Sequence, residues 1–247
     1  RTFGALAPRE GASAGGMPVH ADFPPATPDP LVLTHRGEPD QAAAVIAWPT
    51  GGGSDALPQS RKLEILAQVF SNRLLEAMRE RLGSSYSPSV GSDWPMDVKG
   101  GGNVLAVAQI PPGDVPAFFD AADEIAQDLA ANGPEADELA RVTEPMRQLL
   151  NRVQTGHTFW LNQLAGAGFD TNRVGYIRTL WSDYTEATPA ELQALAQQYL
   201  AGYGGWRLAV MPQQLAQGTA EGAKPAEKGT GAPAISHVTI ADERAPL

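Results

Sequence analysis

The feature that most constrains the fold is a long amphipathic helix that runs into a glycine and is followed by extended chain. Gly83 ends the helical pattern, and residues 86–94 and 104–110 then have the composition of two strands, separated by three glycines at 100–102. A hairpin is the simplest connection between such strands, so we expect an antiparallel sheet covered by the apolar face of the helix. That face is formed by Leu63, Leu66, Phe70, Leu74, Met78 and Leu82.

Further strands and helices are predicted on both sides of this unit. Residues 42–48 form a short apolar run that ends at Pro49, and residues 206–211 form another, so both are expected to be strands. A second helix, closed by Asn132 and Gly133, has an apolar stripe made of Val115, Phe118, Phe119, Ala122, Ile125 and Leu129.

A third helix starts at Pro134, and Pro145 should kink or interrupt it. Thr188, Pro189 and Glu191 form a capping-box pattern that predicts one more helix before the last strand. We therefore expect an α+β fold with one mainly antiparallel sheet and helices packed mainly on one face.

Composition excludes several classes of protein. No apolar run is long enough to span a bilayer, and 28 acidic residues against 18 basic ones argue against nucleic acid or an anionic membrane surface as a partner. The absence of cysteine excludes disulfides, thiolate zinc sites and cysteine nucleophiles, and it is compatible with either the periplasm or the cytoplasm. We expect a bacterial periplasmic protein, with a cytoplasmic location as the alternative.

Three regions differ in composition. Residues 1–30 are rich in proline, glycine and alanine, and we expect a linker there together with the end of a preceding domain. Residues 31–212 carry the periodic elements of one folded domain. Residues 213–247 have the composition of a low-complexity tail, with a possible short strand at 235–240. Because the chain begins with Arg1, we expect a fragment or a processed product.

Arg79 and Tyr86 are the candidate functional residues. Arg79 falls in the last turn of the first helix, and Tyr86 opens the following strand seven residues later. Both side chains donate hydrogen bonds, which suits a peptide carbonyl or a developing oxyanion. Two structural roles are the alternatives, because an arginine there also complements the helix dipole and a tyrosine there also packs against its neighbours.

The segment that holds these two residues resembles the Arg…Tyr segment in the C-terminal half of insulinase/pitrilysin-family zinc peptidases. The match consists of Arg79, Glu80, Gly83, Tyr86 and Val90, although this chain has two serines where the family often has Leu-Ala before the tyrosine. The order of elements over residues 31–212, including the threonine-led helix before the last strand, is also similar to that domain.

The resemblance implies that this chain is the C-terminal, non-zinc half of a two-part zinc metallopeptidase. Arg79 and Tyr86 would then be catalytic residues that bind the peptide backbone and stabilise the oxyanion, while this half closes the substrate chamber like a lid. The partners implied are a peptide substrate and a zinc-bearing N-terminal half, in the same protein or in a separate subunit. A non-catalytic homologue that acts as a structural or peptide-binding subunit is the main alternative, and an unrelated α+β binding domain is another.

The zinc motif of the family is missing from this chain. Its inverted His-x-x-Glu-His helix has only one near match, at His35 to Glu38, where Pro39 replaces the second histidine. No serine triad is apparent, and the glycine triplets at 51–53 and 100–102 lack the lysine of a phosphate-binding loop. We therefore expect no metal or cofactor in this chain, zinc in the other half, and no peptide hydrolysis by this chain alone. The histidines are His20, His35, His157 and His237.

Overall fold

The computed structural model describes residues 20–82, 87–96, 98–168, 172–202 and 204–213. Its strands are β1 His20–Ala21, β2 Leu31–His35, β3 Ala42–Pro49, β4 Ser89–Asp93, β5 Lys99–Gly100, β6 Asn103–Ile110 and β7 Trp206–Pro212. Its α-helices are α1 Leu57–Leu82, α2 Val115–Ala131, α3 Ala136–Val153, α4 His157–Leu164, α5 Asn172–Thr185 and α6 Pro189–Tyr199, with 3-10 turns at Ser54–Ala56 and Pro112–Asp114. Among the described residues, none of the helices has the length and apolar character needed to cross a membrane.

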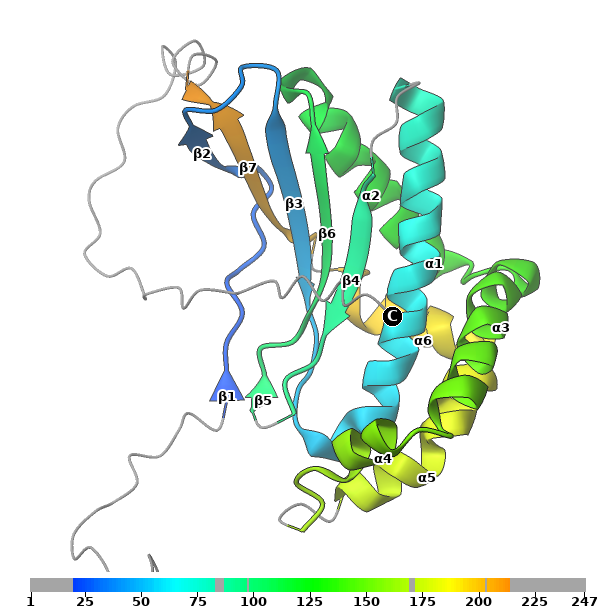
Figure 1. The fold of residues 1–247 in the computed structure, drawn as a ribbon. Helices are drawn as coiled ribbons and strands as arrows, with labels where there is room; N and C mark the ends of the chain where they lie inside the picture. Colours follow the sequence, from blue (N-terminus) through cyan, green and yellow to red (C-terminus); the bar gives the residue numbers. More distant parts are fainter. Residues whose placement is uncertain (1–19, 83–86, 97, 169–171, 203, 214–247) are drawn as a thin grey trace, which may run out of the picture.

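The predicted α+β class is confirmed. The main sheet has the order β2-β7-β3-β6-β4, and every pairing in it is antiparallel except that of β2 with β7. Figure 1 shows α1 and α2 side by side on one face of this sheet, with α3, α4 and α5 extending away below them. The predicted hairpin is formed by β4 and β6, in which Ser89 is opposite Val107 and Asp93 is opposite Asn103.

The core lies between the sheet and the two long helices. The stripe predicted on α1 is buried at Leu63, Leu66, Phe70, Leu74 and Met78, each with 0% of its surface exposed, while the Leu82 side chain lies outside the description. The whole predicted stripe of α2 is buried as well. Trp48 of β3 contacts Phe70 of α1, with ring centroids 5.4 Å apart, so the central strand and the longest helix share one aromatic contact.

Strand β2 and helix α5 were not anticipated from the sequence, nor were the two-residue strands β1 and β5. Strand β2 is parallel to β7 at the edge of the sheet, and its apolar residues Leu31, Val32 and Leu33 remain about half exposed. Helix α5 has a weak apolar pattern and is held in place instead by polar contacts to α1. The possible strand at 235–240 lies outside the described residues.

Helix α3 contains Pro145 without being interrupted there. It begins at Ala136, after a capping box formed by Glu135 and Glu138, and it continues through Pro145 to Val153. The expected interruption at Pro145 is therefore absent. Pro145 lies on the exposed side of the helix, so water can satisfy the carbonyl of Arg141 that lacks an amide partner. The capping box at Thr188, in contrast, is confirmed, because its hydroxyl accepts a hydrogen bond from the Glu191 amide.

The two glycine triplets have a packing role at one end of the sheet. The Gly102 amide donates to the Gly51 carbonyl at 3.0 Å, and the Thr50 amide donates to the Gly102 carbonyl at 2.8 Å. A Cβ atom at Gly102 would lie 2.3 Å from the Gly51 oxygen and 2.7 Å from the Asp93 oxygen. The two loops can approach this closely only without a side chain at Gly102.

Gly102→Ala should therefore destabilise the fold. Both obstructing atoms are backbone oxygens, so the loops must separate, and we expect a loss of about 1–3 kcal/mol in the free energy of unfolding. Gly91→Ala is the matched control, because a Cβ there meets nothing within 4 Å. Urea unfolding of both variants measures the difference, and equal stabilities would contradict the packing role.

Arg73 connects three helices through charged hydrogen bonds. Its Nε and Nη2 atoms donate to the two carboxylate oxygens of Glu138 on α3, at 2.8 and 2.7 Å. Its Nη1 atom donates to Asp128 on α2 at 2.6 Å. The Arg73 hydrogen bond is the largest cause of a lowered pKa for the Glu138 carboxyl group. This fork pairing therefore stabilises the packing of α1, α2 and α3.

Glu138→Gln should lower stability at neutral pH by about 1–3 kcal/mol, the usual worth of a hydrogen bond to a charged group. Because the pKa of Glu138 is lower in the folded state, its contribution is present above the ordinary carboxyl pKa and is lost as the pH falls through the folded value. The gap between wild type and variant should thus shrink in acid. Chemical denaturation at neutral and acidic pH tests this, with Glu124→Gln, from an exposed ion pair, as the control. A gap that stays constant down to pH about 2 would contradict it.

Candidate functional site

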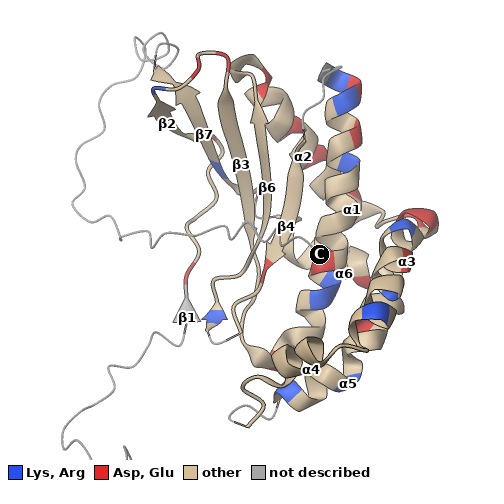
Figure 2. Cartoon of the chain, viewed as in Figure 1, with Lys and Arg blue, Asp and Glu red and all other residues tan. Residues whose placement is uncertain are grey.

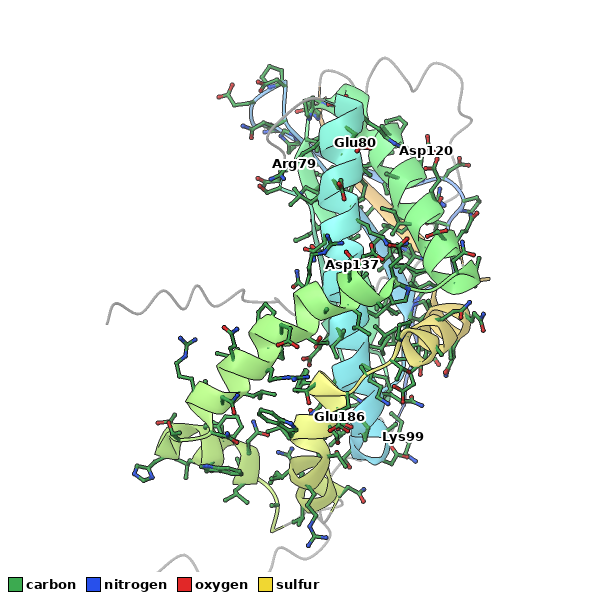
Figure 3. All side chains as sticks on the ribbon, turned by 90° about the vertical axis from the view of Figure 1, so that its right-hand side faces the viewer. Arg79, Glu80, Lys99, Asp120, Asp137 and Glu186 are labelled. Atoms are coloured by element: carbon green, nitrogen blue, oxygen red, sulfur yellow. The ribbon has the colours of Figure 1, made fainter. Side chains whose placement is uncertain are left out.

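Arg79 lies in the last turn of α1, as predicted, and its side chain is exposed. Two other arginines of this helix are engaged: Arg73 pairs with Glu138 and Asp128, and Arg81 pairs with Glu124. Arg79 has no hydrogen bond or ion pair within the part of the chain that the structure describes. Figure 3 shows it projecting from the side of α1 opposite to Asp120 of α2. Its guanidinium is therefore available to a ligand.

A groove runs along the same face of α1. It has a volume of about 510 Å³ and lies between α1 and α3. Its α1 side is lined by Glu64, Ile65, Gln68 and Asn72. Helical geometry places Gln68 and Asn72 within about 20° of Arg79 around the helix axis. On the α3 side the lining residues are Arg141, Val142, Pro145, Met146 and Leu149.

The polar groups of the groove suit an extended peptide. The side chains of Gln68 and Asn72 are exposed, and the Gln68 amide donates only one long hydrogen bond of 3.4 Å to Asn72. Primary amides both donate and accept, so they match the alternating N–H and C=O groups of a peptide backbone. The pattern of the sequence did not single out these two residues. Their helical spacing from Arg79 was the available signal.

Tyr86 lies outside the described residues, so its pairing with Arg79 stays a prediction. Its position in the sequence is four residues after the end of α1 and three before the start of β4. Strand β4 is joined to the middle of α1, because the Val90 amide donates to the Ser71 hydroxyl at 3.2 Å.

Charge around this connection is mixed. Figure 2 shows blue and red residues interleaved along the end of α1 that carries Arg79. Deeper along the same helix, the pKa of the Glu64 carboxyl is raised, because desolvation outweighs its hydrogen bond from the Tyr184 hydroxyl and the charge of Arg61. The pKa of Tyr184 is raised too, mainly by burial and then by Glu64. Glu64 also lines the groove, so the groove holds a carboxyl group with a raised pKa at the end away from Arg79.

The described residues contain no group of three histidine, cysteine, aspartate or glutamate side chains that could hold a metal ion. His35, the nearest match to the zinc motif, is engaged by backbone on both sides. Its Nδ1 accepts from the Gly37 amide at 3.0 Å, so Nε2 carries the proton and donates to the Gln41 carbonyl at 2.8 Å. The residues present therefore do not fit zinc in this part of the chain.

The sequence model of the peptidase M16 inactive domain matches residues 1–146. None of the curated proteins compared with the chain matches it.

Three solved structures have the same fold. A peptidase M16 inactive domain from Pseudomonas fluorescens has a TM-score of 0.63 at 18% identity, and the match covers 78% of this chain and 45% of that one. The periplasmic protease PqqL from Escherichia coli has a TM-score of 0.62 at 17% identity, covering 76% of this chain and 21% of that one. A chain of complex III2 from Candida albicans has a TM-score of 0.56 at 13% identity, covering 74% and 45%.

The chain therefore spans less than half of the length of each of these three. At such identities the likeness establishes the fold alone, whereas the sequence model covers more than half of the chain. The chain belongs to the family of peptidase M16 inactive domains, the non-zinc domains of insulinase-type peptidases.

Proposed function

We propose that this chain is the non-zinc lid half of a two-part zinc metallopeptidase, in which it closes the substrate chamber and presents Arg79 and Tyr86 to the peptide. The observation that carries the proposal is the state of Arg79. It is exposed, has no partner among the described residues and stands on the same helix face as an amide-lined groove. An arginine with a purely structural role would be expected to hold a carboxylate or a carbonyl, as Arg73 and Arg81 do.

The residues of this chain would act by binding and by charge stabilisation. The guanidinium of Arg79 donates to a substrate carbonyl, and the amides of Gln68 and Asn72 bind the neighbouring backbone. The Tyr86 hydroxyl donates to the oxygen on which negative charge develops, an interaction that strengthens in the transition state. Cleavage itself requires the zinc of the other half, since the described part of this chain has no site for it.

Separate expression of the zinc-bearing half tests the lid function. We expect that half alone to show little peptide hydrolysis, and its rate should rise on the order of 100-fold or more when this chain is added or joined to it, because oxyanion stabilisation then becomes available. Equal rates with and without this chain would contradict the proposal. A Gly91→Ala chain, purified and added in the same way, should raise the rate as much as the wild-type chain, because a Cβ at Gly91 meets nothing within 4 Å.

A non-catalytic role as a structural or peptide-binding subunit is the second candidate. The fold likeness to a chain of complex III2 from Candida albicans supports it, because a chain with this fold there forms part of a larger assembly. The two functions differ in one measurable result. A non-catalytic subunit binds peptide through the groove but gives no hydrolysis when combined with any zinc-bearing half.

For location we propose the periplasm. The fold likeness to a periplasmic protease of Escherichia coli supports it, and the absence of cysteine is compatible with it. Fractionation of cells that express the full-length protein tests the proposal, and recovery in the cytoplasmic fraction would contradict it.

A further inference from the structure

A second pocket lies on the other side of α3, next to the groove. It has a volume of about 410 Å³, and most of its lining is apolar. Arg61 and Arg173 are its charged lining residues, and Asn162 and Gln163 add two amides at its α4 side. The apolar lining is Met96, Met146, Leu149, Leu150, Val153, Phe159, Leu180 and the rings of Tyr176 and Tyr184.

Arg61 is an unusual residue for such a wall, because it is 0% exposed. Its Nη1 atom donates to the Asp183 carboxylate at 2.9 Å and to the Tyr176 carbonyl at 2.8 Å. Its Nε and Nη2 atoms have no hydrogen-bond partner among the described residues. These two nitrogens form one edge of the guanidinium, the edge that binds a carboxylate through two parallel hydrogen bonds.

A buried donor edge without a partner is costly, because each nitrogen has lost its hydrogen bond to water and has gained none in return. An anion with two oxygens would remove this cost, and an apolar body would fill the rest of the pocket. We propose that this pocket binds the C-terminal residue of a peptide, with its carboxylate on the Nε/Nη2 edge of Arg61 and its apolar side chain between α3, α4 and α5.

The ring of Tyr176 stacks on the face of the same guanidinium. Its centroid is 3.2 Å from the Arg61 Cζ atom, and the same residue lines the pocket while remaining only half-buried. A carboxylate would bind in the plane of the guanidinium, beside the stacked ring. Asn162 and Gln163 can then bind the last peptide groups of the ligand.

This pocket is separate from the candidate site at Arg79. The two arginines are eighteen residues apart on α1, which corresponds to about 27 Å along the helix. The choice of a peptide as the ligand rests on the proposed function, since peptidases release new C-terminal carboxylates. Binding to this chain alone can be measured without any hydrolysis, so failure of the pocket and failure of the lid function give different results.

Methionine methyl NMR of the 247-residue chain reports on the pocket directly. Met96 lines this pocket and not the groove, Met146 lines both, and Met78 and Met211 line neither, so Met96 is the specific reporter. With the tripeptide Ala-Ala-Phe we expect the methyl signals of Met96 and Met146 to shift and those of Met78 and Met211 to stay. The same peptide with a C-terminal amide should bind at least about 10-fold more weakly, the equivalent of one charge-assisted hydrogen bond.

Two adjacent residues of α4 provide matched variants that leave the Arg61 ion pair intact. Asn162 lines the pocket, and Leu161 does not line it and is 73% exposed. Asn162→Trp should block the pocket and weaken the tripeptide by at least about 10-fold, while Leu161→Trp should change its affinity by less than about 2-fold.

The inference is wrong if the Met96 signal does not shift at saturating tripeptide, or if the Met78 signal shifts as much as that of Met96. It is also wrong if the acid and the amide bind with equal affinity, or if octanoate binds where the tripeptide does not. The last would assign the pocket to a fatty acid instead of a peptide.

Discussion

Tyr86→Phe should lower kcat of the assembled enzyme on the order of 100-fold, the usual cost of removing one oxyanion donor. Phenylalanine keeps the ring and loses only the hydroxyl, so the fold should be retained. A transition-state contact affects turnover more than substrate affinity, and we therefore expect a much smaller change in KM. Steady-state kinetics on a fluorogenic peptide, together with a thermal melt of the same sample, measure both effects.

Tyr199→Phe is the matched control for this variant. Tyr199 lies on α6, and its hydroxyl donates one exposed hydrogen bond of 3.3 Å to Gln59. We expect that variant to keep full activity. A Tyr86→Phe enzyme with normal kcat, or with a loss equal to that of Tyr199→Phe, would assign Tyr86 a packing role.

Asp183→Ala should cost about 3–5 kcal/mol of stability, because it leaves the charge of Arg61 buried without its counterion. Asp183 is 7% exposed and Arg61 is 0% exposed, so water cannot replace the lost carboxylate. This ion pair also attaches α5 to α1, and α5 carries few buried apolar residues of its own. Guanidinium unfolding of the purified chain gives the difference.

Two further variants test whether the loss of stability comes from the buried ion pair. Glu186→Ala removes an exposed carboxylate just after α5, visible in Figure 3, and should change stability by less than about 0.5 kcal/mol. The double variant Arg61→Met with Asp183→Leu removes both charges and should recover most of the loss. If Asp183→Ala were as mild as Glu186→Ala, the buried pair would not be what holds α5.

The parts of the fold that could be predicted are those with a strong local signal. The apolar stripes of α1 and α2, the β4–β6 hairpin and the capping box at Thr188 all follow from spacing or turn chemistry. Strand β2 could not be found in this way, because an edge strand that is exposed on both faces shows no alternation. Helix α5 was missed because its attachment is a long-range ion pair between Arg61 and Asp183, which local periodicity does not report.

The candidate site likewise has one part that the sequence predicts and one part that it does not. The seven-residue spacing of Arg79 and Tyr86 is local, so the sequence alone was enough to select them. The groove beside Arg79 depends on how α3 crosses α1, and that crossing is fixed by tertiary contacts such as the Arg73–Glu138 pair. No pattern within either helix contains this information.

The most direct test of the central claim compares Arg79→Lys with Arg81→Lys in the enzyme assembled with its zinc-bearing half. The two arginines are two residues apart on the same helix turn, but Arg81 is paired with Glu124 and Arg79 has no partner among the described residues. Lysine keeps the charge and loses the planar fork, so a substrate contact at Arg79 should be weakened while the fold is kept. We predict at least about a 10-fold loss of kcat/KM for Arg79→Lys, with an unchanged Tm, and near wild-type activity for Arg81→Lys. Equal activities of the two variants would contradict a role of Arg79 in peptide hydrolysis.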